Sequence, residues 1–146
     1  MARVVLGSER LTIYATDLSR TTDDGLWRFN FPYRHYEVEV LLAGDDHGPD
    51  PKWLSLAESV SAQVEQFVLE ATTYLKSFVD GGRFGCPGDW SLEWMEFGRN
   101  IDSKMQCPFE LVFVLDEDIY GGWGVLFSDA GDPVGYCSRQ FRRFAR

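Results

Sequence analysis

An apolar stripe with helical spacing runs through residues 51–79 and limits the folds open to this chain. Asp50 followed by Pro51 supplies an N-cap and a proline at the first helical position, and Gly81-Gly82 supplies a stop signal. These signals predict one helix from about residue 51 to 79, which at 1.5 Å per residue would be about 43 Å long. Such a helix can lie across a whole sheet. The stripe consists of Trp53, Ala57, Val60, Val64, Phe67, Ala71, Leu75 and Phe78.

The rest of the chain alternates apolar and polar residues with the period of two that is typical of half-buried strands. In residues 36–42, Val38 and Val40 face one side and Glu37 and Glu39 face the other. Short turn segments join several of these stretches, which favours antiparallel pairing. Further strands are predicted near residues 3–7, 10–15, 26–31, 90–97, 109–115, 122–128 and 133–138.

These patterns predict a single α+β domain over residues 1–146. Its expected architecture is a twisted, mostly antiparallel sheet packed on one long central helix, in the order ββββ-α-ββββ. A chain of 146 residues, 45% of them hydrophobic, is long enough to bury one core without disulfides.

A single helix leaves one face of the predicted sheet uncovered. Strict alternation places Tyr36, Val38, Val40, Trp90, Leu92, Trp94, Phe109, Leu111, Phe113 and Leu115 on the face that meets the helix. The opposite face receives Glu37, Glu39, Glu93, Met95, Glu110, Val112 and Val114. Two interpretations stay open: a strongly curved sheet that hides the apolar members, or a surface for a partner, because apolar residues ringed by charge are typical of contact sites.

Charge is distributed unevenly along the chain. All 23 acidic residues and ten of the 14 basic residues fall in residues 1–138, which gives this part a formal charge of −13. Such a field repels nucleic acid and anionic membranes and attracts cationic partners. The N-terminal residues contain too few apolar side chains for a secretion signal, so the expected compartment is the cytoplasm. The remaining basic residues are Arg139, Arg142, Arg143 and Arg146.

One loop combines side chains that divalent cations prefer. Asp45, Asp46, His47 and Asp50 lie within six residues, but Asp50 is already explained as a helix cap, and the spacing lacks the glycine and distal glutamate of a calcium loop. We therefore predict no metal and no cofactor.

Few residues favour catalysis. The chain has only two histidines, His35 and His47, and its three cysteines show no C-x-x-C pair. A small hydrolase or ligand-binding enzyme would have to use a Cys–His pair or the carboxylates Asp116, Glu117 and Asp118, which also suit a solvated turn that borders the partner surface.

In its type, an acidic α+β chain rich in aromatic residues and without a catalytic set, the protein is similar to bacterial immunity proteins that neutralise toxins. The resemblance implies a noncatalytic protein that binds a cognate basic toxin. The alternatives are a phage-type mimic of nucleic acid, or the small enzyme above. A homodimer through the open sheet face is a further expectation.

Overall fold

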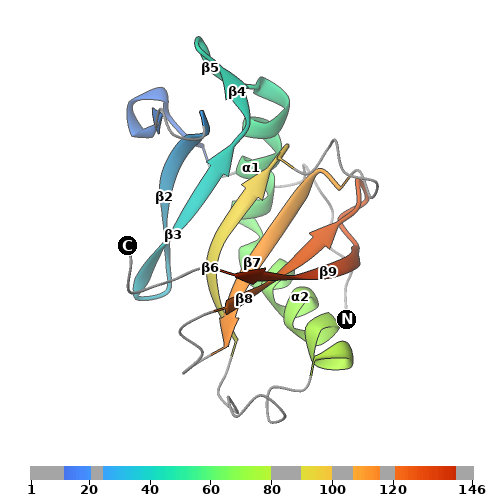
Figure 1. The fold of residues 1–146 in the computed structure, drawn as a ribbon. Helices are drawn as coiled ribbons and strands as arrows, with labels where there is room; N and C mark the ends of the chain where they lie inside the picture. The colour runs from blue at the N-terminus through green and yellow to red at the C-terminus, as the bar shows by residue number, and fades with distance from the viewer. Residues whose placement is uncertain (1–11, 21–24, 80–89, 100–106, 116–120, 141–146) are drawn as a thin grey trace.

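A computed structural model of the chain describes residues 12–20, 25–79, 90–99, 107–115 and 121–140. Figure 1 shows a sheet that lies against a helical segment. In chain order the elements are the 3-10 turn η1 (Ala15–Asp17), β1 (Ser19–Arg20), β2 (Trp27–Tyr33), β3 (Tyr36–Leu42), β4 (Gly44–Asp45), β5 (Gly48–Pro49), α1 (Pro51–Ala62), α2 (Val64–Phe78), β6 (Trp90–Phe97), β7 (Phe109–Leu115), β8 (Gly121–Phe127) and β9 (Pro133–Gln140).

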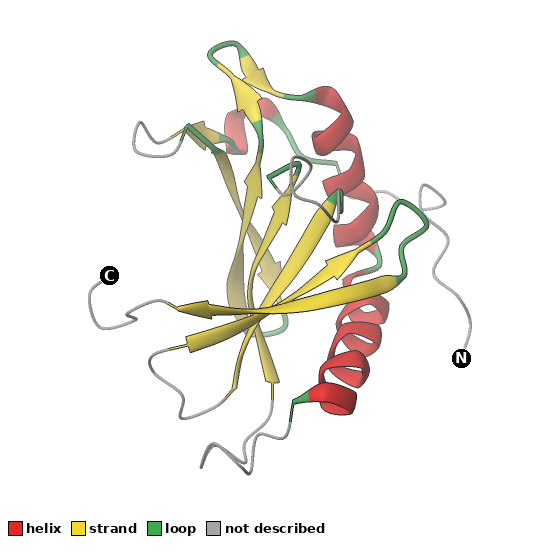
Figure 2. Ribbon diagram, turned by 45° about the vertical axis from the view of Figure 1, so that its right-hand side comes forward, coloured by secondary structure: helices red, strands yellow, loops and turns green. Residues whose placement is uncertain are grey.

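The described strands form a seven-stranded sheet in the order β1-β2-β3-β6-β7-β8-β9, and β4 pairs with β5 in a separate hairpin. Neighbouring strands are antiparallel except β3 and β6, which are parallel because the helical crossover between them returns the chain to the same end of the sheet. Both helices cover one face of this sheet (Figure 2). The predicted α+β class with a mostly antiparallel sheet is confirmed. The ββββ-α-ββββ order is not shown, since the described order is β1 to β5, α1, α2 and β6 to β9.

The predicted start of the helix is correct, but its predicted continuity is wrong. Asp50 accepts a hydrogen bond from the backbone N–H of Lys52 at 2.9 Å, and Pro51 begins α1. At Gln63 the backbone leaves the helical region (φ −121°, ψ 27°), and α2 begins at the next residue. The N–H of Gln63 bonds to the carbonyl of Val60, three residues back, rather than continuing the α-helical pattern.

The break lets the two helices follow a twisted sheet. α1 packs against β3 and β6, whereas α2 packs against β8 and β9. Because adjacent strands rotate relative to one another, a straight rod would lose contact with one end of the sheet. The apolar stripe nevertheless continues through the break, and its members from Trp53 to Leu75 are buried.

An aromatic cluster forms the centre of the core. Phe67 of α2 is fully buried and packs edge-on against Phe109 and Phe127, with ring centroids 5.5 Å away in each case. Phe109 and Phe127 stack on each other at 4.8 Å, and Phe97 lies 5.6 Å from Phe109. α2, β6, β7 and β8 are therefore joined by one set of ring contacts.

The strand predictions vary in outcome. The ranges 36–42, 90–97 and 109–115 are confirmed as β3, β6 and β7, and β2, β8 and β9 agree with their predictions to within two residues at each end. The range 3–7 lies outside the described residues. Within 10–15, the described part begins at residue 12 and leads into η1 rather than forming a strand.

A candidate partner-binding groove on the open face of the sheet

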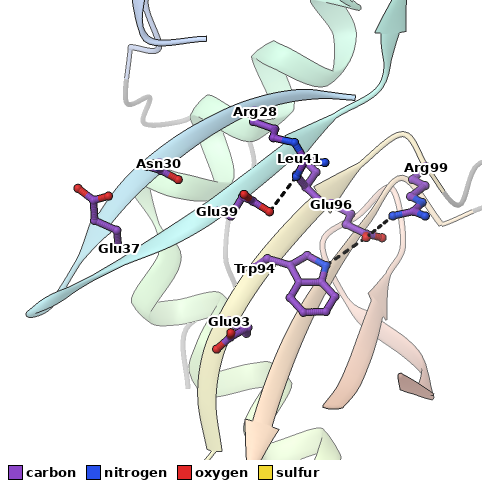
Figure 3. Close-up of a pocket in the computed structure, with 9 residues that line it drawn as sticks. All are labelled: Arg28, Asn30, Glu37, Glu39, Leu41, Glu93, Trp94, Glu96 and Arg99. Atoms are coloured by element: carbon purple, nitrogen blue, oxygen red, sulfur yellow. Dashed lines mark hydrogen bonds and ion pairs between the residues drawn. The ribbon is translucent and has the colours of Figure 1, made fainter. Parts of the chain in front are cut away.

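A groove of about 510 Å³ opens on the face of the sheet that the helices leave uncovered. It lies over β2, β3 and β6, and Figure 3 shows Arg28 pointing toward Glu39 and Arg99 pointing toward Glu96. We call it the acidic groove. The described residues that line it are Arg28, Asn30, Glu37, Glu39, Leu41, Glu93, Trp94, Glu96 and Arg99.

A β-bulge in β6 determines which side chains reach the groove. Leu92 pairs with Phe113, but Trp94 pairs with Val112, so Glu93 is one extra residue in β6. The extra residue reverses the alternation after it. Trp94, predicted to face the helix, therefore lines the groove.

The same bulge corrects the prediction for Met95. Strict alternation placed Met95 on the open face, whereas it is fully buried in the core on the helix side. Phe97, two residues on, joins the same core. Glu96 lies between them and points to the groove instead.

Glu96 and Trp94 hold each other in place. Glu96 is only 1% exposed, and a carboxylate removed from water needs compensating donors. It accepts a hydrogen bond from the indole N–H of Trp94 at 3.1 Å and one from the guanidinium of Arg99 at 2.9 Å. These bonds fix the orientation of the indole before any ligand arrives.

A second ion pair crosses from β2 to β3. The guanidinium of Arg28 donates to Glu39 at 2.9 Å, and both side chains are partly exposed. The described lining thus contains four glutamates and two arginines, a formal charge of −2. It contains no histidine, cysteine or hydroxyl side chain among the described residues, so its residue types suit the binding of positive charge better than nucleophilic chemistry.

The structure separates the predicted surface residues into three groups. Glu37, Glu39 and Glu93 come together in the acidic groove, as a shared face requires. Glu110, Val112 and Val114 alternate with the core residues of β7, but they are buried, at 0%, 0% and 2% exposure. Their predicted place on an exposed partner surface is therefore wrong, and the alternative of a sheet that hides its apolar residues holds for Val112 and Val114. Asp116, Glu117 and Asp118 lie outside the described residues.

Glu110 is buried because the sheet packs closely around it. A Cβ added at Gly124 of β8 would lie 2.7 Å from the carboxyl carbon of Glu110, so this carboxylate occupies the space that a larger residue at 124 would fill. The thiol of Cys137 donates to Glu110 at 3.5 Å. Glu110 is also paired in register with Glu96 across β6 and β7. The open face is therefore exposed over β2, β3 and β6 but closed over β7.

The acidic side chains of the loop from Asp45 to Asp50, considered above as a cation site, form contacts within the protein. Asp45 accepts the backbone N–H of His47 at 2.8 Å, which lowers the pKa of its carboxyl group. Asp46 forms an ion pair with Arg20, and Asp50 caps α1. Among the described residues no group of three potential ligands is arranged to hold a metal ion.

Neither of the two described cysteines is in a disulfide. Cys107 is buried, and this burial raises the pKa of its thiol. Cys137 is partly exposed and contacts Glu110. Cys86 lies outside the described residues.

Sequence reasoning missed Arg28, Asn30, Leu41, Glu96 and Arg99 as groove residues and placed Trp94 on the wrong face. One signal could have corrected Trp94. Leu92 and Phe97 are both strongly apolar but are five residues apart, so strict alternation cannot bury both, and a bulge between them is needed.

Comparison with known proteins finds no matching family model, no similar curated protein and no similar solved structure. Within the described part of the chain, no helix has both the length and the apolar character that crossing a bilayer requires.

Proposed function

We propose that this protein binds a cationic protein through the acidic groove and acts as an immunity-type inhibitor of a basic toxin. The observation that carries the proposal is the orientation of Trp94, whose indole is fixed by Glu96 at the edge of an open groove that also contains Glu37, Glu39 and Glu93.

An arginine or lysine side chain of the partner suits this arrangement. A cation over an indole face gains about 0.5–2 kcal/mol, and carboxylates around it add charge-assisted hydrogen bonds. Because Trp94 is held before binding, little side-chain entropy is lost at this position. The indole therefore serves as the anchor of the interface, in the way that buried aromatic residues dominate other interfaces.

The charge of the whole chain supports the same partner. At a formal net charge of −9, the protein attracts basic partners over long range and speeds their association. This attraction is screened over about 8 Å at physiological ionic strength, so added salt should lower the association rate more than it raises the dissociation rate.

Binding in the groove can be tested with a short arginine-rich peptide as the probe. We expect the indole N–H signal of Trp94, assigned with a Trp94→Phe variant, to shift saturably in a ¹H–¹⁵N titration. Glu93→Lys should lower the affinity for the peptide by about tenfold or more. Asp129→Lys is the matched control, because Asp129 is an exposed acid in the β8–β9 turn and the change in net charge is the same. Equal losses for the two variants would show that only overall charge matters.

Inhibition can be tested by coexpressing the chain with basic toxins, beginning with any that is encoded beside its own gene, and measuring cell growth. The wild type and Asp129→Lys should restore growth, while Trp94→Ala and Glu93→Lys should not. If the folded groove variants protect as well as the wild type, the groove is not the inhibitory surface.

A further inference from the structure

β9 leaves one edge of the sheet open. It pairs with β8 on one side, and no described strand pairs with its other side. An extra residue at Val134 interrupts the β8–β9 register, so Gly135–Gln140 is the regular part of this edge. An edge strand presents backbone donors and acceptors that another strand can pair with, and natural edges are usually protected by charge. Residues 133–138 contain no charged side chain.

Exposed aromatic side chains border this edge. Tyr136 of β9 stacks on Phe78 of α2 at 5.2 Å, and Tyr74 lies 4.9 Å from Phe78 and 6.3 Å from Tyr136. Phe78 is 56% exposed, Val134 45% and Tyr136 40%. At 150–250 Å² for a whole aromatic side chain, Phe78 and Tyr136 together expose roughly 200 Å². We call Tyr74, Phe78 and Tyr136 the aromatic patch.

The charges along β9 indicate what covers this surface. Asp129 and Asp132 precede the strand, and Arg139 stands at its far end. If a second β9 pairs antiparallel, the acidic end of each strand lies opposite the basic end of the other. Parallel pairing would instead place like charges side by side, which is destabilising.

We propose that two copies of this chain pair through β9, antiparallel and about a two-fold axis near Tyr136. The pairing joins the two seven-stranded sheets and brings the two aromatic patches together in an isologous contact. The patch lies with α2 on the helix side of the sheet, whereas the acidic groove lies on the opposite face, so the dimer leaves both grooves accessible. This surface differs from the open face, where two acidic grooves would repel each other.

The contact is smaller than a standard interface of about 1,200–2,000 Å², so the dimer should be reversible, with a dissociation constant of roughly 10–100 µM. Sedimentation velocity from about 1 to about 500 µM should show a concentration-dependent shift from monomer to dimer. Tyr136→Lys places two like charges near the axis and should weaken the dimer by more than about tenfold. Leu69→Lys is the matched control. Leu69 is a 48% exposed residue of α2, and the nine positions between it and Phe78 are two and a half turns, which places the two residues on opposite sides of the helix.

Two further variants keep the test decisive. Phe78→Ser, at a more exposed position, should also weaken the dimer and replaces Tyr136→Lys if that variant does not fold. Asp132→Arg alone should weaken the dimer, and adding Arg139→Asp should restore it, since each acidic end faces a basic end. A wild type that stays monomeric at every concentration overturns the proposal. The edge of β9 would then be available for a strand of another protein. A dimer that the folded patch variants do not weaken overturns it as well.

Discussion

Replacing Gly124 by alanine should force the buried carboxylate of Glu110 to move. An alanine Cβ would overlap the Oε2 atom of Glu110 and lie 2.7 Å from Cδ and 3.2 Å from Cγ. A surface glutamate would swing aside at little cost. Glu110 is fully buried, so its carboxylate can move only if the groups packed around it move as well.

The expected magnitude combines two destabilising contributions with one stabilising contribution. Overpacking costs about 1–3 kcal/mol, and displacing a buried carboxylate from its hydrogen-bond donors costs a further 1–3 kcal/mol. Alanine in a strand is favoured over glycine by about 0.5–1 kcal/mol, because glycine loses more backbone freedom on folding. Gly124→Ala should therefore lower the free energy of unfolding by about 1–5 kcal/mol.

A double-mutant cycle separates the cost of the overlap with Glu110 from the gain that alanine brings in a strand. In a Glu110→Ala background the overlapping atoms are gone, so the same Gly124→Ala change should be neutral or should raise stability by up to about 1 kcal/mol. Urea unfolding followed by circular dichroism measures all four proteins. If Gly124→Ala costs the same in both backgrounds, to within about 0.5 kcal/mol, Glu110 does not occupy the space above Gly124 and the account of its burial is wrong.

Two other predictions follow from the core and from β2. Phe67→Ala should lower the free energy of unfolding by about 3–5 kcal/mol, because it removes a fully buried ring that packs against Phe109 and Phe127. A loss below about 1 kcal/mol in a urea melt would contradict this packing. Burial and the nearby charge of Glu65 raise the pKa of Tyr33 to about 12. The folded protein should then hold a proton that the unfolded chain releases above pH 10, so stability falls between pH 10 and 12 by about 2–3 kcal/mol. Tyr33→Phe should lose this part of the pH dependence, and an unchanged slope would refute it.

The sequence predicted the elements of this fold better than it predicted their continuity. The apolar spacing and the Asp50-Pro51 cap located the start of α1 correctly. The break at Gln63 could not be found in the same way, because no proline or glycine marks it and the apolar stripe continues across it. It depends on the twist of a sheet whose strands come from other parts of the chain.

The candidate site was predicted in part for a similar reason. Alternation grouped Glu37, Glu39 and Glu93 correctly, because β3 pairs with β2 in an unbroken register and Glu93 precedes the reversal in β6. After the bulge the side chains of β6 face the opposite way from the prediction. The prediction therefore left Trp94 out of the groove and wrongly included Met95. The exposure of Glu110 could not be inferred from its own strand, since its burial depends on Gly124, fourteen residues later.

The parallel pairing of β3 with β6 affects the order in which the molecule can fold. β6 to β9 form a meander of near neighbours, and β2 and β3 form a hairpin, so both pieces need only short loops to close. Joining β3 to β6 requires the chain to close a loop that includes both helices. Because this loop is the longest, its closure costs the most conformational entropy, and we expect this pairing to form last. The acidic groove spans this junction, with Glu39 on one side and Trp94 on the other. A folding intermediate that lacks the junction contains both halves of the lining but has no groove, so binding through it begins only when folding is complete.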